Sequence, residues 1–379
     1  MASSSTIQMV DLKNQYLKIK SEIDEAISSC LISTNFIKGP QVQAFENSLA
    51  TYLNVKHVVS CANGTDALQI ALMALNLKPG DEVIVPAFTY VASAEVIGLL
   101  GLVPVMIDVD YSSFNTTLEN IKKGISAKTK AIIPVHLFGQ SSEMEQLMNF
   151  ANENNLYVIE DNAQALGATY TFTNGKQQKV GTIGHIGCTS FFPTKNLGCF
   201  GDGGTMMTND DELAGKLRMI ASHGQKEKYY HQVIGINSRL DTLQAAILDI
   251  KLKYLDQYVA ARQSVAAAYN KGLATLKELE LPSVAGYSTH TYHQYTMKVR
   301  SGKRNELMQH LRNNGVPSMI YYPLPLQQQE AFKPIAIAAE ELTNSAKLSQ
   351  SVLSLPIHTE MTTEQQDYII NTVKSFFNE

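Results

Sequence analysis

The chain has 379 residues, of which 44% are apolar and 17% are charged, and its formal net charge is −4. A chain of this length can bury a large core and predicts a main domain together with a smaller one. Lysine and arginine are scattered along it, and no basic stretch is interleaved with aromatic residues. We therefore expect no nucleic acid as a main partner.

Membrane insertion and export are not expected either. The longest apolar run, "VIGLLGLVPVMI" at residues 96–107, is interrupted by Pro104 and falls short of the roughly 20 residues that cross a bilayer. The first residues, "MASSSTIQM", lack the charged and apolar regions of a signal peptide. The cysteines form no CxxC pair and are predicted to be free thiols of a reducing compartment: Cys30, Cys61, Cys188 and Cys199. A cytoplasmic protein is the expectation.

Periodicity predicts alternating helices and strands through the first two thirds of the chain. Helices are expected near residues 12–30, 42–53 and 66–75. Strands are expected at "EVIVPA", "VPVMIDVD", "KAIIPVH" and "LYVIED", with amphipathic segments between them. This alternation is typical of an α/β fold in which a mainly parallel sheet is covered by helices on both faces.

A long helical stretch is predicted next, from Ser238 to about Leu279, followed by the Pro-, Gly-, Ser- and Tyr-containing segment "LPSVAGYSTHTYHQY". We predict two domains on this basis. Residues 1–250 would form a large α/β domain with an N-terminal helical segment. Residues 251–379 would form a smaller α+β domain that the chain enters through the long helix.

Four polar segments follow predicted strands, at the edge where parallel sheets collect their ligands. They are "SCANGTDA" after "HVV", "PAFTY" after "EVIV", "EDNAQ" after "LYVI" and "TKNLG" after "CTSFF". Ordinary solvent-exposed loops would not be expected to place such a polar segment directly after a strand at four separate positions. The coincidence predicts a binding site along this edge.

The first of these segments places Asn63, Gly64 and Thr65 before an amphipathic helix. Unpaired N–H groups at a helix N-terminus, aided by the helix dipole, can bind an anion such as phosphate. The alternative is an ordinary helix cap by Asn63 or Thr65. The motif also lacks the lysine of a P-loop, so both interpretations stay open.

Asp161 follows Glu160 at the end of the strand "LYVI" and precedes Gln164. A strand-end acid can bind a metal, act as a base or pair with a heterocyclic cation such as a protonated pyridine nitrogen. It can also simply cap a helix. The nine histidines show no HxH or HxxxH spacing, so a metal is the weaker alternative and we expect none.

Lys195 follows the strand-like run "CTSFF", in which Cys188, Ser190 and Phe192 are predicted to share one face. Burial lowers the pKa of a lysine, and a neutral amine is a nucleophile suited to Schiff-base chemistry. A lysine whose ammonium group reaches solvent is the alternative. The glycines of "NLGCFGDGG" favour the first interpretation because they let the backbone turn tightly against a bulky group.

A pyridoxal phosphate (PLP) site needs three groups: an anion-binding site, a strand-end acid and a strand-end lysine. They would serve its phosphate, its ring nitrogen and its aldehyde. Here the anion-binding site would be the helix start at Gly64 and Thr65, which we call the anion seat. The sequence also resembles a family known to bind this cofactor. "NGTDALQIAL", "PAFTYVASAE", "VIEDNAQALGA", "TSFFPTKNLGCFGDGG", "SHGQ" and "GINSRLDTLQAAIL" are similar, in order, to motifs of the DegT/DnrJ/StrS sugar-nucleotide aminotransferases.

The resemblance implies the type I PLP aminotransferase fold and a homodimer with shared active sites. It implies transfer of an amino group, commonly from glutamate, which leaves 2-oxoglutarate, to a keto sugar carried on a nucleoside diphosphate. By this resemblance Lys195 would bind PLP as a Schiff base and act as acid and base, and Asp161 would hold the pyridine nitrogen. The remaining cofactor contacts would come from Gly64, Thr65, Tyr90, Gln164, Ser190 and, from the neighbouring subunit, Asn237.

Within the family, the chain is most similar to 3-aminotransferases of UDP-linked 2-acetamido-2-deoxy-3-oxo-hexuronates, enzymes of surface polysaccharide biosynthesis. Arg239 would meet the sugar carboxylate. This chain departs from that subgroup at two places. It has Tyr321, Tyr322 and Pro323 where the subgroup tends to have His-Tyr-Pro, and it has "EDNAQ" where the subgroup usually has "EDAAQ". Tyr321 and Tyr322 are predicted to contact the sugar, but their contacts should differ from those of the subgroup's His-Tyr-Pro.

Other functions remain as alternatives. The substrate could be keto at another carbon or be carried on dTDP or GDP. A sugar 3-dehydratase is disfavoured because such relatives have histidine where this chain has Lys195. A PLP-binding regulatory protein without turnover is disfavoured by the acidic net charge and the absence of a helix-turn-helix signature. A structural α/β protein without a cofactor is the last alternative.

Overall fold

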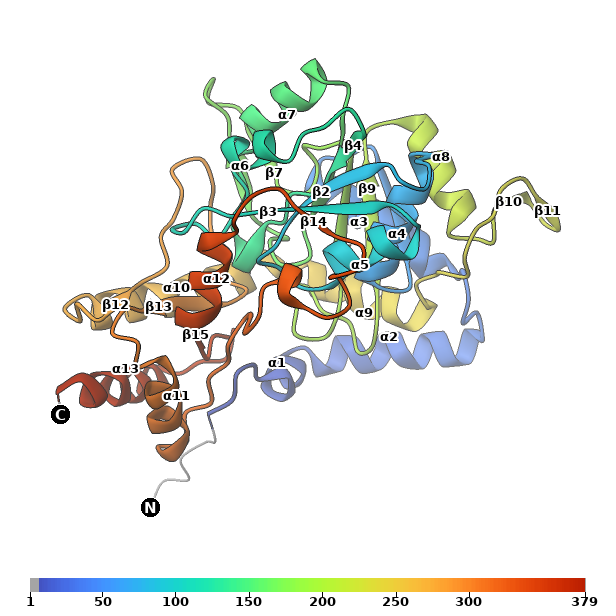
Figure 1. Cartoon of the computed structure of the whole chain (residues 1–379). Coiled ribbons are helices and arrows are strands. Elements are labelled where there is room, and N and C mark those ends of the chain that lie inside the picture. The colour runs from blue at the N-terminus through green and yellow to red at the C-terminus, as the bar shows by residue number, and fades with distance from the viewer. Residues whose placement is uncertain (1–6, 379) are drawn as a thin grey trace.

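The computed structural model describes residues 7–378, and its centre is an eight-stranded sheet (Figure 1). The strand order is β1-β9-β8-β5-β4-β2-β3-β14, and only β9 runs against the others. The strands are β1 (His57–Cys61), β2 (Glu82–Pro86), β3 (Val103–Ile107), β4 (Thr129–Ile132), β5 (Tyr157–Asp161), β8 (Ile186–Ser190), β9 (Gly204–Thr208) and β14 (Ile337–Ala338). The predicted mainly parallel sheet is confirmed.

Helices cover both faces of this sheet because its strands are apolar on both faces. In β2, for example, Val83 and Val85 point to one core and Ile84 to the other. The first face packs against α4 (Gly64–Ala74), α5 (Ala92–Leu99) and α8 (Asp211–Ile220). The second face packs against α3 (Pro40–Leu53), α6 (Leu118–Lys123), α7 (Met144–Glu153) and α9 (Thr242–Leu252).

Two helices predicted as continuous are broken. The N-terminal one is divided into α1 (Leu12–Lys18) and α2 (Lys20–Ser33) at Ile19, which leaves helical geometry and whose N–H bonds three residues back to the Tyr16 carbonyl. The stretch expected from Ser238 to Leu279 is divided into α9 and α10 (Leu255–Leu273). At that break the N–H groups of Lys253 and Tyr254 bond three residues back rather than four, which tightens the turn.

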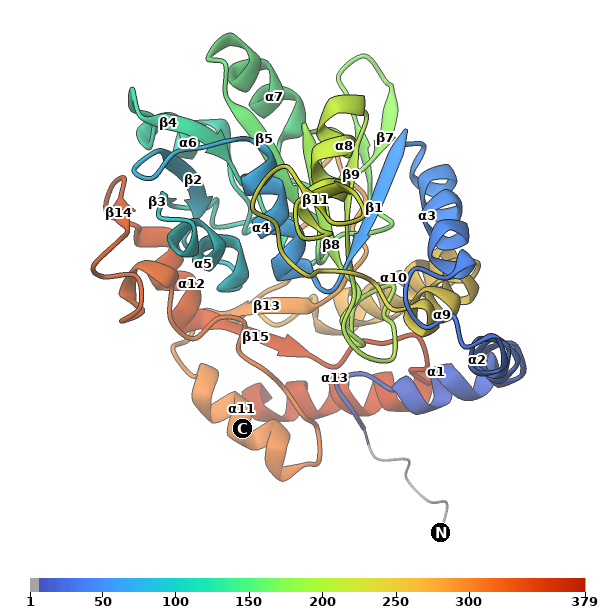
Figure 2. The same cartoon turned by 90° about the vertical axis from the view of Figure 1, so that its right-hand side faces the viewer.

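A second, antiparallel sheet of β12 (Leu279–Glu280), β13 (Tyr295–Val299) and β15 (Val352–Leu355) lies beneath the large one (Figure 2). It packs against α10, α11 (Arg304–Asn313) and α13 (Thr363–Asn378). Between β13 and β15 the chain returns to the large sheet, where β14 pairs in parallel with β3. The domain boundary at residue 250 stays a prediction.

The remaining elements lie in the connections. They are α12 (Thr343–Ser351), the 3₁₀ turns η1 (Leu137–Gly139) and η2 (Leu326–Gln328), and the hairpins β6 (Thr169–Thr171) with β7 (Gln177–Lys179) and β10 (Gln225–Glu227) with β11 (Tyr230–His231). All four cysteines are buried and free, as predicted. No helix within residues 7–378 is long and apolar enough to span a membrane.

The parallel strands bring their carboxyl ends to one edge of the sheet. The segments that follow β1, β2, β5 and β8 therefore lie together there, and these are the four polar segments singled out in the sequence. One detail differs, because β8 ends at Ser190. Phe192 lies outside the strand and is 50% exposed, so it does not share a face with Cys188.

Candidate active site

Lys195 lies in the loop after β8, close enough to Asp161 at the end of β5 for their charges to interact. Its backbone N–H donates to the Phe192 carbonyl at 2.8 Å. Its side chain has no hydrogen bond or ion pair with any other described residue. The surrounding protein lowers the pKa of this amine to about 8, although the Asp161 carboxylate acts in the opposite direction.

Asp161 is buried and held by two donors. The Ser93 hydroxyl donates to Oδ2 at 2.7 Å and the Ala163 N–H donates to Oδ1 at 3.1 Å. Each carboxylate oxygen therefore keeps a free lone pair. The sequence analysis did not predict a role for Ser93, which lies three residues after the polar segment "PAFTY".

The neighbouring acid, Glu160, anchors the end of β5. It is fully buried and accepts hydrogen bonds from the N–H groups of Gly181, Ile183 and Gly184 at 2.9, 2.6 and 2.6 Å. The ring of His136 lies 2.8 Å away through Nε2. The Glu160 carboxylate thus uses its hydrogen-bonding capacity within the fold. Of the two acids, Asp161 is the one available to interact with Lys195 or a ligand.

Gln164, three residues after Asp161, bonds to two aromatic residues of the site. Its Oε1 accepts from the Phe138 N–H at 2.7 Å, and its Nε2 donates to the Tyr322 hydroxyl at 3.1 Å. Tyr322 lies against Tyr90, with ring centroids 6.4 Å apart, and Tyr90 itself is 57% exposed. Burial raises the pKa of Tyr322, so its hydroxyl stays protonated. The ring of Tyr321 lies 6.1 Å from that of Tyr322.

The N-terminus of α4 combines the two interpretations left open by the sequence. The Asn63 side chain caps the helix by accepting from the Asp66 N–H at 2.8 Å. The N–H groups of Gly64 and Thr65 have no acceptor among the described residues, which leaves two donors for an anion. Ser190 lies directly beside them, since a Cβ added at Gly64 would come within 2.6 Å of the Ser190 Cβ.

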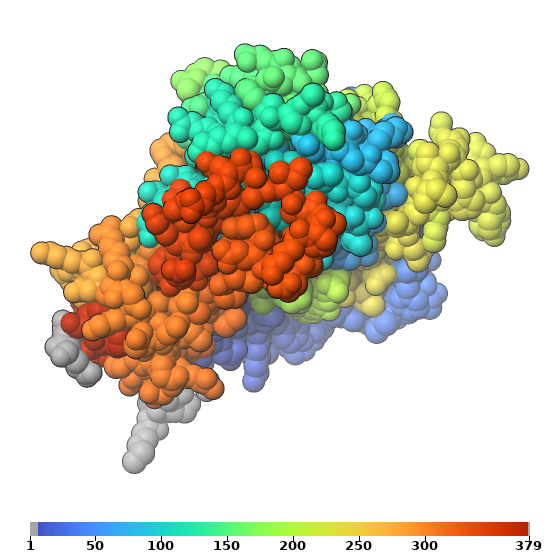
Figure 3. Space-filling model, in the orientation of Figure 1, coloured from blue at the N-terminus to red at the C-terminus, as the bar shows by residue number. Residues whose placement is uncertain are grey.

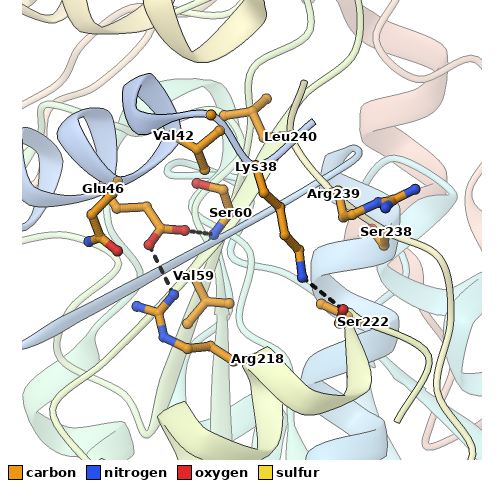
Figure 4. Close-up of a pocket in the computed structure, with 13 residues that line it drawn as sticks. Lys38, Val42, Glu46, Val59, Ser60, Arg218, Ser222, Ser238, Arg239 and Leu240 are labelled. Atoms are coloured by element: carbon orange, nitrogen blue, oxygen red, sulfur yellow. Dashed lines mark hydrogen bonds and ion pairs between the residues drawn. The ribbon is translucent and has the colours of Figure 1, made fainter. Parts of the chain in front are cut away.

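Asn237 and Arg239 are not brought to Lys195 within one chain. Asn237 is exposed, and no interaction joins either residue to Lys195 or Asp161 among the residues that the structure describes. Arg239 lines a pocket of about 260 Å³. The Glu46–Arg218 ion pair lies on the opposite side of this pocket, and the Arg239 guanidinium points away from it (Figure 4). Their proposed role in a partner's site stays a prediction.

His293 was also missed, and no sequence signal marked it. It is 6% exposed, and its Nδ1 has no hydrogen-bond partner. Burial and the nearby charge of Lys195 both lower its pKa, so the imidazole is neutral. No group of three or more potential metal ligands occurs within the described part of the chain.

A family model describing the DegT/DnrJ/EryC1/StrS aminotransferases matches residues 17–374. The chain belongs to this aminotransferase family. It is 44% identical to a Pseudomonas aeruginosa UDP-2-acetamido-2-deoxy-3-oxo-D-glucuronate aminotransferase, over 93% of this chain and 95% of the relative. It is also 44% identical to a Geobacillus stearothermophilus "pleiotropic regulatory protein", over 98% of both chains.

Solved structures of the DegT family confirm the type I aminotransferase fold. A Brucella abortus family member superimposes with a TM-score of 0.93 at 40% identity, covering 98% of this chain and 100% of that one. A Bacillus subtilis protein with bound cofactor PMP gives a TM-score of 0.88 at 32% identity, covering 98% and 83%. PMP is the amino form of PLP, so the family supports this cofactor.

The site of this DegT-family chain also fits PLP on its own geometry. Two unpaired N–H groups and a serine suit a phosphate, a buried carboxylate with free lone pairs suits a pyridine N–H, and an amine without a partner suits an aldehyde. Lys195, Asp161, Gly64, Thr65 and Ser190 would hold the cofactor. The side-chain amide of Gln164 bonds through its oxygen to Phe138 and through one N–H to Tyr322, so its second N–H is left for the ring oxygen.

Alanine substitutions at two glycines test whether the anion seat binds the PLP phosphate. We expect Gly64→Ala to weaken PLP binding by at least about tenfold, because the new methyl group would lie 2.6 Å from the Ser190 Cβ and would push Ser190 away from the anion seat. Gly215→Ala is the matched control, since a Cβ there meets nothing within 4 Å. Fluorescence titration of the apoprotein with PLP measures both. Equal affinities for the two variants would contradict this seat.

The pKa of Lys195 predicts how its reactivity depends on pH. With a pKa of about 8, roughly a tenth of the amines are neutral at pH 7, far more than for a lysine in water. Competitive acetylation of the apoprotein, followed by mass spectrometry of the Lys195 peptide, should give a midpoint near pH 8. Asp161→Asn should move the midpoint lower, because the lost carboxylate had raised the pKa. A midpoint above pH 10 would contradict the burial argument.

Proposed function

We propose that this aminotransferase moves an amino group from glutamate to the keto carbon of a nucleoside-diphosphate sugar, using PLP. The first candidate is a UDP-linked 3-oxo-2-acetamido sugar or its uronate, which would serve surface polysaccharide biosynthesis in the cytoplasm. The observation that carries this proposal is a half-buried lysine amine, without a hydrogen-bond partner among the described residues and of lowered pKa, near a carboxylate and an anion seat. The similarity to the Pseudomonas aeruginosa enzyme supports the choice of sugar.

The residues of this chain have distinct tasks in such a reaction. PLP, when bound, supplies an aldehyde that carries the amino group and a ring that accepts electrons. Lys195, neutral in an appreciable fraction of molecules, takes a proton at its Nζ from the substrate carbon and returns it. Asp161 keeps a positive charge on the ring nitrogen through its free lone pairs. Ser93 fixes the carboxylate for this task.

The sugar pocket would differ from that of the hexuronate enzymes at Tyr321 and Tyr322. A tyrosine hydroxyl can donate to a sugar oxygen as a histidine does, but it does not become a cation near neutral pH. If the sugar has a carboxylate, Arg239 is the residue we propose for it, because a guanidinium binds a carboxylate through two parallel hydrogen bonds. That contact would be made in the partner's site.

A regulatory role without turnover is the second candidate, favoured by the 44% identity to the Geobacillus stearothermophilus regulatory protein. Both candidates need the cofactor, and they differ in catalysis. Turnover with a sugar nucleotide would therefore decide between them.

Purified protein should convert glutamate to 2-oxoglutarate when supplied with a UDP-linked 3-oxo-2-acetamido sugar, as coupled dehydrogenase absorbance can measure. Lys195→Ala should lower the rate by several orders of magnitude, because both the covalent anchor and the proton carrier are lost. Equal turnover of a 6-deoxy keto sugar and a 3-oxo-hexuronate would reject the uronate preference. A wild-type protein that binds PLP but turns over no keto sugar would favour the regulatory role.

The proposed shared site depends on residues 235–239, which follow the hairpin β10–β11 where it projects from the body of the molecule (Figure 3). In a two-fold dimer the exchange is reciprocal, so each chain would lend Asn237 to its partner's phosphate and Arg239 to its partner's sugar.

Mixing two inactive variants tests the exchange. Lys195→Ala and Asn237→Ala/Arg239→Ala should regain activity together, toward about half of wild type per heterodimer, because one of the two sites is then intact. Activity after subunit exchange is the measurement, with each variant alone as the control. No recovery despite proven exchange would mean that the segment serves its own chain.

A further inference from the structure

Thr291 is a fully buried residue that precedes β13 and contacts three loops at the carboxyl edge of the large sheet. These loops follow β4, β5 and β8, and they contain Gly139, Gln164 and Asn196 respectively. No other part of the second sheet's connections is bonded to all three loops within the described residues. Thr291 is therefore the point where the C-terminal part of the chain meets the active-site loops.

The Thr291 hydroxyl has a complete set of hydrogen bonds. It accepts from Asn196 Nδ2 at 2.8 Å, and its own hydrogen faces the carbonyls of Gly139 at 3.2 Å and Gln164 at 3.4 Å. The backbone N–H of Thr291 also donates to the Gly139 carbonyl, at 2.7 Å. One side-chain oxygen thus joins the loop of Lys195 to the loop of Asp161 and Gln164.

The close approach at Gly139 indicates how tightly these loops are packed. Gly139 has φ +118°, and an added Cβ would lie 2.5 Å from Thr291 Oγ1 and 2.9 Å from the Tyr292 nitrogen. Only glycine is tolerated where both the backbone conformation and the space exclude a side chain.

Lys195 depends on this arrangement because its side chain has no partner of its own. Its position is set by its loop, and the next residue, Asn196, is held through Nδ2 by Thr291 and by the Leu166 carbonyl at 3.2 Å. On the other side, Gln164 holds the Phe138 N–H and the Tyr322 hydroxyl.

We propose that Thr291 is a positioning residue, whose hydroxyl holds the Lys195 loop and the Gln164 loop at the separation that the reaction needs. The proposal rests on the proposed function, since it takes Lys195 as the reacting amine. A small displacement of such a group lowers the rate steeply, because reacting atoms must be aligned before they react.

Two substitutions separate the hydroxyl from the shape of the side chain. Thr291→Val keeps the volume and removes the hydroxyl, while Asn196 Nδ2 keeps its bond to the Leu166 carbonyl. Thr291→Ser keeps the hydroxyl and removes the methyl group. We compare the rate at which each apoprotein takes up PLP, followed by absorbance, with kcat, the KM for glutamate and the urea midpoint of unfolding.

Thr291→Val should slow PLP uptake and lower kcat by about tenfold each, with KM changed by less than about twofold and a urea midpoint like that of Thr291→Ser. Thr291→Ser should restore uptake and kcat to within about twofold of wild type. Wild-type uptake and kcat in Thr291→Val would overturn the proposal. Equal losses in both variants would also overturn it, because the methyl group would then matter rather than the hydroxyl.

A third variant covers the case in which Thr291→Val does not fold. Asn196→Ala removes the same hydrogen bond from the other side and leaves Thr291 in place, so it should show the same loss of uptake and kcat. Normal values there would overturn the proposal. Wild-type protein that takes up no PLP would instead overturn the proposed function, and this proposal with it.

Discussion

The electrostatic relation between Lys195 and Asp161 is the constraint on which the rest of the site depends. Burial favours the neutral amine, and the carboxylate favours the charged one, so the pKa of about 8 is their balance. A closer ion pair would keep the amine protonated and unreactive, whereas a lysine without an acid nearby would lose its proton at a lower pH. The fold must therefore hold the two side chains apart at the ends of adjacent strands, and β5 and β8 are such neighbours.

Holding that separation requires that the strand ends do not move, and buried polar groups provide this rigidity. Glu160 accepts from three backbone N–H groups of the segment 181–184 and contacts His136, which fixes the end of β5 next to Asp161. Removing one partner from such a buried set leaves the others unsatisfied, at a cost of a few kcal/mol. Of the two acids at the end of β5, Asp161 is therefore the one whose carboxylate keeps lone pairs free for a ligand.

The sheet, its helices and the ligand edge were predictable because hydrophobic periodicity and strand-end polarity are local properties of the sequence. Asp161 and Lys195 were marked by such local signals, and so was the anion seat at Gly64. The breaks at Ile19 and Lys253 were not, since no sequence pattern marks the tightened backbone turn that ends the helix at each of them. The resemblance supplied Tyr90, Gln164 and Asn237, whose roles no local pattern indicates.

Residues that act through contacts distant in sequence escaped both kinds of reasoning. Ser93 bonds to Asp161 across 68 positions of the chain, and His293 comes near Lys195 from the segment that precedes β13. Space decides such contacts more than residue type: at Gly64 and at Gly204 an added Cβ would lie 2.6 Å from Ser190 and 2.3 Å from the Asn63 carbonyl. Because these two glycines bring β8 and β9 against the start of α4, the phosphate seat and the Lys195 loop share one packed interface. A side chain added at either glycine would therefore press on both the anion seat and a strand that flanks the Lys195 loop.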